Sequence, residues 1–193
     1  MPHILPKEFY EKYDTVSLSK KLLGCTLVHD SQEGRTAGII VETEAYLHND
    51  PACHAYRKKT PRNAAMFEGA GVSYVYLIYG LYHCFNIVSG EKNIGEAVLI
   101  RALEPVEGIE LMQTRRGTKD IKNLCSGPAK LVTAMGITPD FNFLPLYADE
   151  FYCIPPDNED FEIVTTTRIG ITQGADLLYR FYIKGNKFVS KLK

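Results

Sequence analysis

The stretch YVYLIYGLYHCFNIV, residues Tyr74–Val88, contains two apolar runs that meet at a single glycine, Gly80. β-Branched and aromatic residues favour strands, and a glycine between two such runs is typical of a tight turn. The sequence therefore predicts strands over Tyr74–Ile78 and Cys84–Val88 that are joined as an antiparallel β-hairpin.

Similar runs lie on both sides of this hairpin and are separated by turn residues. We expect strands over Thr26–His29, Thr36–Glu44, Ala97–Leu103, Ile163–Ile171 and Phe181–Ser190. No repeat or linker interrupts this order, and a chain of 193 residues with 45% hydrophobic residues has the size of one domain. The expected fold is α+β, a single domain over residues 1–193 with a mostly antiparallel sheet.

Four segments have the composition of helices that pack against this sheet. They are Phe9–Tyr13, Val16–Leu23, Pro105–Arg116 and Ser126–Met135. Asp14 and Thr15 are the possible N-caps of the second helix, Ser126 is the expected cap of the last, and proline at the first turn suits a start at Pro105. The acidic, proline-containing segment that ends at Asp160 is expected to be a surface excursion.

The net charge of -1 hides an uneven distribution of acidic and basic side chains. Residues 149–162 contain six acids and no Lys or Arg, which leaves 22 basic against 17 acidic side chains elsewhere. A modest basic face that binds nucleic-acid phosphates is compatible with this distribution, although solvated surface charge explains any single residue more simply. The candidates form three groups: Arg57, Lys58, Lys59 and Arg62; Arg115, Arg116, Lys119 and Lys122; Lys184, Lys187, Lys191 and Lys193.

The five cysteines are odd in number and include no CxxC pair, which argues against a disulfide framework and against a structural zinc site. We expect reduced thiols, mostly buried. No apolar run approaches the roughly 20 residues that cross a bilayer, and the first residues lack the pattern of a signal peptide. The expected location is the cytoplasm.

The segment VETEAY places Glu42, Glu44 and Tyr46 on one strand face, because side chains alternate along a strand. An ionised glutamate in a partly enclosed site beside an aromatic ring can act as a general base. A polar strand face without chemistry is the alternative interpretation.

The loop that follows contains His48, Asp50 and His54, which are residue types that bind metals. A metal-dependent hydrolase is therefore a second interpretation of this region. The loop has no helical His pair and the chain has no second cluster of ligands, and both facts disfavour a metal site.

The aromatic hairpin is the third candidate site. Tyr79, beside the turn glycine, is expected to project from the hairpin, which suits a wedge between base pairs. The rings behind it suit a stacking pocket for an extruded base, especially a cationic one, although a buried aromatic ladder is the simpler explanation for some of them. Arg101 lies in an apolar strand and requires an anion, either Glu104, a carboxylate on a neighbouring strand or a DNA phosphate.

Together these segments closely resemble the alkyladenine (3-methyladenine) DNA glycosylase family, and the chain looks like a bacterial homologue of the human enzyme. The resemblance covers nearly the whole chain, through IIVETEAY, HAYRKKTPRNAAMF, YVYLIYGLYHCFNIV, AVLIRALEPVEG, LCSGPAKL, RIGI and RFYIKGNKFVS in the family's order. It implies a curved sheet flanked by helices with a protruding hairpin, like the C-terminal domain of formyltransferases. The segments His54–Thr60 and Arg168–Arg180 are shorter than in mammalian relatives, whose basic N-terminal extension is also lacking.

The resemblance also implies catalytic and base-binding roles. Glu44 corresponds to the general base, and Arg101 and the backbone carbonyl of Ile169 look like its partners in holding the nucleophilic water. The flipped base would be enclosed or selected by Tyr46, His54, Tyr76 and Asn86, of which Asn86 looks like the residue that excludes guanine.

DNA contacts are implied for Tyr79, which resembles the intercalating residue, and for Thr60 and Lys130. The implied reaction is hydrolysis of the N-glycosidic bond of alkylated or deaminated purines in double-stranded DNA, which leaves an abasic site. The candidate bases are 3-methyladenine, 7-methylguanine, hypoxanthine and ethenoadenine. No cofactor, metal, membrane or lyase step is implied, and a monomer is expected. A non-catalytic module that binds damaged nucleic acid is the alternative, and such a module would be indifferent to Glu44.

Overall fold

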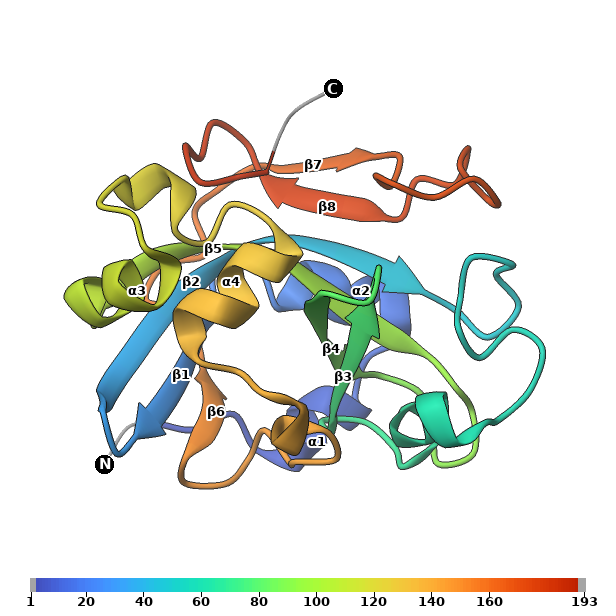
Figure 1. The fold of residues 1–193 in the computed structure, drawn as a ribbon. Helices are drawn as coiled ribbons and strands as arrows, with labels where there is room; N and C mark the ends of the chain where they lie inside the picture. The colour runs from blue at the N-terminus through green and yellow to red at the C-terminus, as the bar shows by residue number, and fades with distance from the viewer. Residues whose placement is uncertain (1–2, 191–193) are drawn as a thin grey trace.

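The computed structural model describes residues 3–190 as an eight-stranded, curled antiparallel sheet with helices packed against it (Figure 1). The strands are β1 (Thr26–Ser31), β2 (Gly34–Tyr46), β3 (Ser73–Ile78), β4 (Tyr82–Val88), β5 (Ala97–Glu107), β6 (Phe151–Ile154), β7 (Ile163–Thr166) and β8 (Arg180–Ile183). The α-helices are α1 (Lys7–Glu11), α2 (Thr15–Lys21), α3 (Ile109–Arg116) and α4 (Pro128–Met135), and the 3₁₀ helices are η1 (Pro61–Phe67), η2 (Ile121–Asn123) and η3 (Pro139–Phe141). The predicted α+β class and the curved, mostly antiparallel sheet are confirmed.

Strand β2 organises the sheet because it is long enough to pair with three strands. Its first part, Gly34–Ile39, pairs with β1, and Glu42 to Glu44 pair with β8. Strand β5 pairs along the opposite edge of β2, and the main path of the sheet runs β3-β4-β5-β2-β1-β6. Glu42 and Glu44 therefore lie inside the sheet, with paired strands on both edges of β2.

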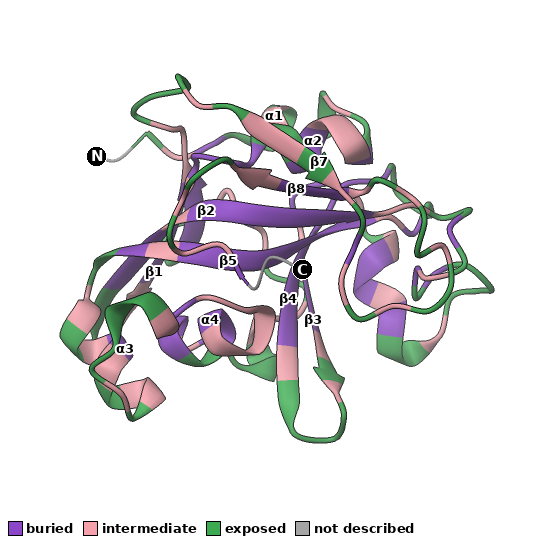
Figure 2. Ribbon diagram, turned by 90° about the horizontal axis from the view of Figure 1, so that it is seen from above, coloured by how far each residue is buried: buried purple, intermediate pink, exposed green. Residues whose placement is uncertain are grey.

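Strands β3 and β4 form the predicted hairpin, with Tyr74 opposite Asn86 and Ile78 opposite Tyr82. The turn contains Tyr79 at φ 53° and Gly80 at φ 71°. Two successive positive φ values are typical of a type I′ turn, which the Leu81 amide closes here by donating to the Ile78 carbonyl at 3.3 Å, and glycine adopts such a value without a steric penalty. Figure 2 shows the hairpin tip projecting from the body of the molecule, with exposed residues at its end.

The predicted helix that starts at Pro105 is wrong in its first four residues. Strand β5 continues to Glu107, and its register against β2 shifts where Gly38 faces Pro105 and Ala37 faces Glu107. A proline is tolerated in a strand at such a bulge. Helix α3 begins only after Gly108, which has φ +70° and no room for a side chain, because a Cβ there would lie 2.2 Å from the Arg35 carbonyl oxygen.

The acidic segment is not only a surface excursion, since it contains β6. Residues Phe151, Tyr152 and Cys153 are buried, and β6 pairs with β1. Strand β6 has only four residues, which is too short for an alternating pattern to be recognised in the sequence. Its stability comes from pairing with β1, more than 100 residues earlier. The acids at positions 157–160 are exposed, as expected.

Several predicted boundaries also require correction. Strand β7 ends at Thr166 instead of Ile171, and β8 ends at Ile183 instead of Ser190, because both segments leave the sheet to contact β2 side chains. Helix α4 starts at Pro128 with Gly127 as N-cap, so Ser126 is not the cap, whereas Asp14 accepts from the Ser17 amide as predicted. The basic residues Lys191 and Lys193 lie outside the described residues.

All five cysteines are buried and free, as the sequence predicted for reduced thiols. Burial raises the pKa of the Cys53 thiol to about 11, and it raises the pKa of Cys84 as well. Within residues 3–190, the helices are all too short or too polar to span a membrane.

Candidate active site

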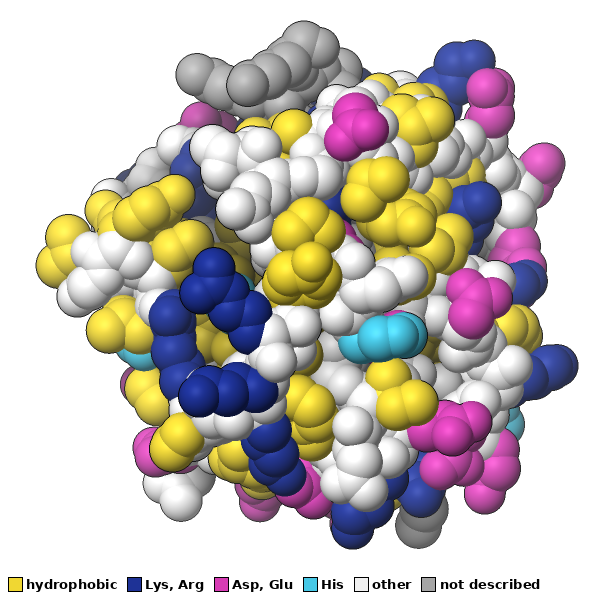
Figure 3. Space-filling model, turned by 90° about the vertical axis from the view of Figure 1, so that its right-hand side faces the viewer, with side chains coloured by type: hydrophobic (Ala, Val, Ile, Leu, Met, Phe, Trp, Pro, Cys, Tyr) yellow, Lys and Arg dark blue, Asp and Glu magenta, His cyan; other side chains and the backbone are white. Residues whose placement is uncertain are grey.

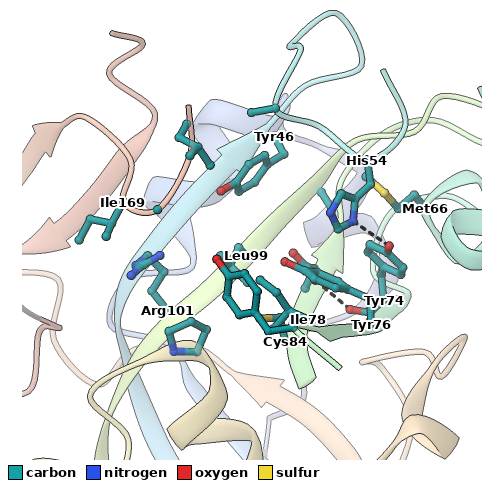
Figure 4. Close-up of a pocket in the computed structure, with 17 residues that line it drawn as sticks. Tyr46, His54, Met66, Tyr74, Tyr76, Ile78, Cys84, Leu99, Arg101 and Ile169 are labelled. Atoms are coloured by element: carbon teal, nitrogen blue, oxygen red, sulfur yellow. Dashed lines mark hydrogen bonds between the residues drawn. The ribbon is translucent and has the colours of Figure 1, made fainter. Parts of the chain in front are cut away.

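A pocket of about 320 Å³ opens between the middle of the sheet, the hairpin and the segment that follows β7 (Figure 4). Seven of the residues singled out in the sequence line it: Tyr46, His54, Tyr76, Tyr79, Asn86, Arg101 and Ile169. Its volume is at the lower end of the usual range for small-molecule pockets. Aromatic rings from separate elements dominate the walls, so the pocket suits a planar, unsaturated group.

Glu44 lies directly behind one wall of this pocket and has no exposed surface. Its Oε1 accepts from the Ile169 amide at 2.9 Å and lies 3.2 Å from Arg101 Nη1, and its Oε2 accepts from the Tyr46 hydroxyl at 2.9 Å. All three partners line the pocket. The structure therefore joins four separately predicted positions into one arrangement around a carboxylate.

Glu42 forms a second buried anion beside the first. Its Oε1 accepts from Arg101 Nε at 3.2 Å and from Arg180 Nε at 2.6 Å, and its Oε2 accepts from the Ser190 amide at 2.7 Å. Arg101 thus bridges Glu42 and Glu44, so that of the three anions that the sequence left open the structure gives it carboxylates of a neighbouring strand. Burial alone would lower the pKa of Arg101, but the charges of Glu44 and Glu42 outweigh burial. The pKa of Arg101 is therefore raised, and the guanidinium stays charged.

Tyr46 keeps its proton because burial, and then the charge of Glu44, raise the pKa of its phenol. The hydroxyl is therefore a donor toward Glu44 Oε2. Figure 4 shows Tyr46 and Tyr76 on different sides of the pocket, which leaves room for a flat group between two rings.

His54 forms the third aromatic wall and packs edge-on against Tyr76, with ring centroids 4.5 Å apart. Its Nδ1 contacts the Tyr74 hydroxyl at 2.9 Å. Desolvation of the ring, and then the charge of Arg62, lower the pKa of His54. The imidazole is therefore neutral at neutral pH and presents its second nitrogen as a hydrogen-bonding group without positive charge.

Asn86 is buried on β4, and its Nδ2 donates to the Tyr74 carbonyl at 3.0 Å. That bond fixes the amide group in the pocket wall. The Tyr79 side chain is 80% exposed and stands at the pocket mouth, at the tip of the hairpin. A large ring on a left-handed residue is unusual, since such positions favour glycine or asparagine, and the exposed position is typical of a contact surface.

Thr60 and Lys130 do not line the pocket among the described residues. Thr60 caps η1, where its amide donates to Asn63 Oδ1 at 2.6 Å, and it lines a neighbouring hollow with the exposed Arg57, Lys58 and Arg62. Figure 3 shows Lys and Arg side chains gathered on this face of the molecule. Lys130 on α4 contacts Asn123. Among the residues of α4, only Pro128 lines the pocket.

The three candidate metal ligands make separate contacts. His48 contacts Glu96, Asp50 is buried against Arg168, and His54 contacts Tyr74. Over residues 3–190, no three His, Cys, Asp or Glu side chains are grouped to hold a metal ion.

Several residues of the site carried no recognisable signal in the sequence. Met66, Cys84 and Leu99 are such residues, and they complete the pocket walls together with Tyr74, one of the hairpin rings for which the sequence had indicated a stacking pocket. The Ile169 amide, and not its carbonyl, contacts Glu44, whereas the role of the carbonyl stays a prediction. Arg168 precedes this amide and is the partner of Asp50, 118 residues earlier, a pairing that only the folded chain reveals.

A ring-walled pocket with a carboxylate behind it is the kind of site in which DNA glycosylases hold an extruded base. Comparison with known proteins agrees, since residues 8–187 match the family described as methylpurine-DNA glycosylase (MPG). The chain belongs to the methylpurine-DNA glycosylase family.

Similar proteins share this length and sequence almost throughout. A protein of Methanoculleus marisnigri, named "Putative 3-methyladenine DNA glycosylase", is 54% identical over 97% of this chain and 98% of its own. Proteins of the same name from Carboxydothermus hydrogenoformans and Clostridium acetobutylicum are 50% and 49% identical, over 97% and 98% of this chain and 99% and 98% of their own.

Proposed function

We propose that this protein is a 3-methyladenine DNA glycosylase that hydrolyses the N-glycosidic bond of alkylated purines in double-stranded DNA by a water molecule activated by Glu44. The observation that carries the proposal is the carboxylate of Glu44, fixed by Tyr46, Arg101 and Ile169 directly behind an aromatic pocket. The names of the similar proteins support the choice of substrate.

The base would be flipped out of the duplex and held between Tyr46 on one side and Tyr76 and His54 on the other. Ring faces attract positive charge, so this pocket favours purines that alkylation has made cationic. Asn86, held by the Tyr74 carbonyl, would meet the edge of the base and reject the exocyclic amine of guanine.

Glu44 Oε2 has Tyr46 as its one hydrogen-bond partner among the described residues, and a carboxylate oxygen accepts more than one hydrogen bond. The second position would take the water, which then attacks the sugar carbon as the base leaves. Because Glu44 has no exposed surface, this water would enter from the pocket, past Tyr46, Arg101 and Ile169.

A cationic methylpurine leaves without protonation, which suits a pocket whose histidine is neutral. Neutral bases such as hypoxanthine and ethenoadenine would leave more slowly, because the lowered pKa of His54 makes it a poor proton donor. The lining residues of the pocket include no lysine in the described part of the chain, so a Schiff base with the sugar is not expected. The product would therefore be an intact strand with an abasic site.

Tyr79 would fill the space that the flipped nucleotide vacates, as apolar wedges do in bent DNA. The exposed cluster Arg57, Lys58, Lys59 and Arg62 lies beside the pocket mouth and would bind phosphates, with Thr60 at the helix start that follows. Lys130, near the first turn of α4, would contact the DNA backbone on the opposite side of the pocket. One chain supplies all these groups, so we propose a monomer.

The test is single-turnover release of free base from duplexes that contain 7-methylguanine or hypoxanthine, in the presence of a chelator. Wild type is expected to release 7-methylguanine, and Glu44→Gln is expected to lower the rate by about 100-fold or more while it still binds the duplex. Glu104→Gln is the matched control, because this carboxylate on β5 contacts Asn186 instead of the site. Equal rates for wild type and Glu44→Gln would refute the mechanism, and binding without release by wild type would favour a non-catalytic module.

A further inference from the structure

We propose that Arg168, held by Asp50 behind the Tyr46 ring, is a positioning residue whose charge, offset in part by Asp50, limits the preference of the pocket for cationic over neutral bases. The inference rests on the proposed function, since it requires a base stacked on the open face of Tyr46. Arg168 touches no substrate in this proposal and acts through the ring.

The Arg168 side chain is fully buried and its guanidinium is fixed from several directions. Its Nη1 contacts the Asp50 carboxylate and donates to the Ala45 carbonyl at 3.0 Å, and its Nη2 donates to the Gly174 carbonyl at 3.2 Å. Asp50 is itself fixed by the Ala52 amide at 2.9 Å. One buried ion pair thus ties together the end of β2, the loop after it and the segment after β7.

The guanidinium carbon of Arg168 lies 4.6 Å from the centroid of the Tyr46 ring. This distance defines a cation–π contact. Arg168 has no exposed side-chain surface, and the described residues that line the pocket include Tyr46 but not Arg168. The cation therefore lies on the closed face of the ring, and the open face is left for the base.

Arg168 also fixes two of the groups that hold Glu44. The residue after it, Ile169, donates its amide to Glu44 Oε1, and the ring in front of it, Tyr46, donates its hydroxyl to Glu44 Oε2. Anchoring of Arg168 by Asp50 therefore sets the orientation of both oxygens of the carboxylate.

The charge of Arg168 has a consequence separate from its geometry. A positive charge behind an aromatic ring opposes a second positive charge on the other face, and Asp50 offsets this opposition because it pairs with the guanidinium. Removal of the cation should therefore favour a cationic base, and removal of the anion should disfavour it. Loosening of the structure alone would change the binding of both kinds of base in the same direction.

The experiment measures equilibrium binding in a Glu44→Gln background, in which excision is slow. The probes are duplexes with 7-methylguanine, a cation slightly below neutral pH, and with 7-methyl-7-deazaguanine, which has the same shape without the charge. The measured quantity is the ratio of the two dissociation constants, with a duplex of unmodified guanine as reference.

Arg168→Gln is expected to raise the preference for the cation about fivefold, and Asp50→Asn is expected to lower it by a similar factor. Lys184→Gln, which removes an exposed ion pair between Lys184, just after β8, and Glu162, just before β7, should leave the ratio unchanged. Shifts of both variants in the same direction, or lower affinity at a constant ratio, would overturn the inference but leave the proposed function intact.

If Arg168→Gln does not fold because it leaves Asp50 buried without its partner, the double variant Asp50→Asn/Arg168→Gln replaces it. This variant should have a higher preference for the cation than Asp50→Asn alone, and an equal or lower preference would contradict the inference. If the Glu44→Gln parent binds neither methylated duplex better than unmodified guanine, the proposed function fails, and the inference fails with it.

Discussion

Tyr46 donates its hydroxyl to Glu44 Oε2 across 2.9 Å, from a position two residues further along the same strand. Residues at this spacing lie on one face of a strand, so β2 brings the ring and the carboxylate together without help from another element. The ring faces the pocket and the hydroxyl faces the carboxylate, which couples the binding surface for the base to the proposed general base.

Tyr46→Phe should keep the ring and remove the donor. We expect excision of 7-methylguanine to slow by about tenfold, the equivalent of one hydrogen bond, with nearly unchanged affinity for the lesion duplex. Single-turnover rates and binding measured side by side check this expectation. A loss of affinity with an unchanged rate would show that the hydroxyl serves binding and does not orient Glu44.

Glu42→Gln should destabilise the fold by about 3 kcal/mol, because it leaves Arg101 and Arg180 buried without their shared anion. Urea unfolding measures the change. Glu162→Gln, which removes an exposed partner of Lys184, is the control and should cost less than about 1 kcal/mol. Similar small effects of both variants would mean that the buried cluster contributes little net stability.

Tyr79→Asn should separate stability from DNA binding. Asparagine tolerates the left-handed conformation of Tyr79 better than a large ring does, so the free energy of unfolding should rise slightly or stay constant. Loss of the wedge should lower affinity for lesion duplex by about tenfold or more, which titration with labelled DNA would detect. Wild-type affinity in this variant would remove Tyr79 from the DNA contact surface.

His54 should make stability depend on pH. Its pKa in the folded state lies below the ordinary value of 6.5, so in the interval between these two values the unfolded chain binds more protons. Stability is therefore highest above that interval and should fall as pH decreases through it. His54→Gln should remove this part of the pH dependence, which unfolding curves at neutral and mildly acidic pH would measure.

Arg62→Gln supplies a second check of the lowered pKa of His54. Removal of the nearby cation should raise the pKa of His54 toward its ordinary value, although desolvation, the larger cause, is unchanged. Nuclear magnetic resonance titration of the ring would report this shift. A further decrease of the pKa would contradict the assigned influence of Arg62.

The features that local pattern predicts well are those that a few neighbouring residues decide. The hairpin of β3 and β4 has alternating aromatic residues and a turn glycine, and the start of α2 has an aspartate whose side chain caps it. The common face of Glu42, Glu44 and Tyr46 follows from the geometry of one strand. For these elements the sequence alone was sufficient.

Long-range pairing decides the features that the sequence did not reveal. Pro105 lies in a strand because β5 has a bulge at Val106 where it pairs with β2, and β6 is a strand because β1 has a free edge beside it. Likewise, Arg168 meets Asp50 only after the sheet has closed. Each case depends on a partner that no window of neighbouring residues contains.

Glu42 is bound by the amide and the hydroxyl of Ser190, 148 residues later in the chain. A ribosome must therefore make nearly all of the protein after β2 before the anion beside Glu44 obtains its full set of partners. Contacts this distant in sequence form late, because a long loop must close first. In a nascent chain the rings of β2 and of the hairpin are therefore complete before Ser190 reaches Glu42, the anion that shares Arg101 with Glu44. We expect base excision only from the finished fold.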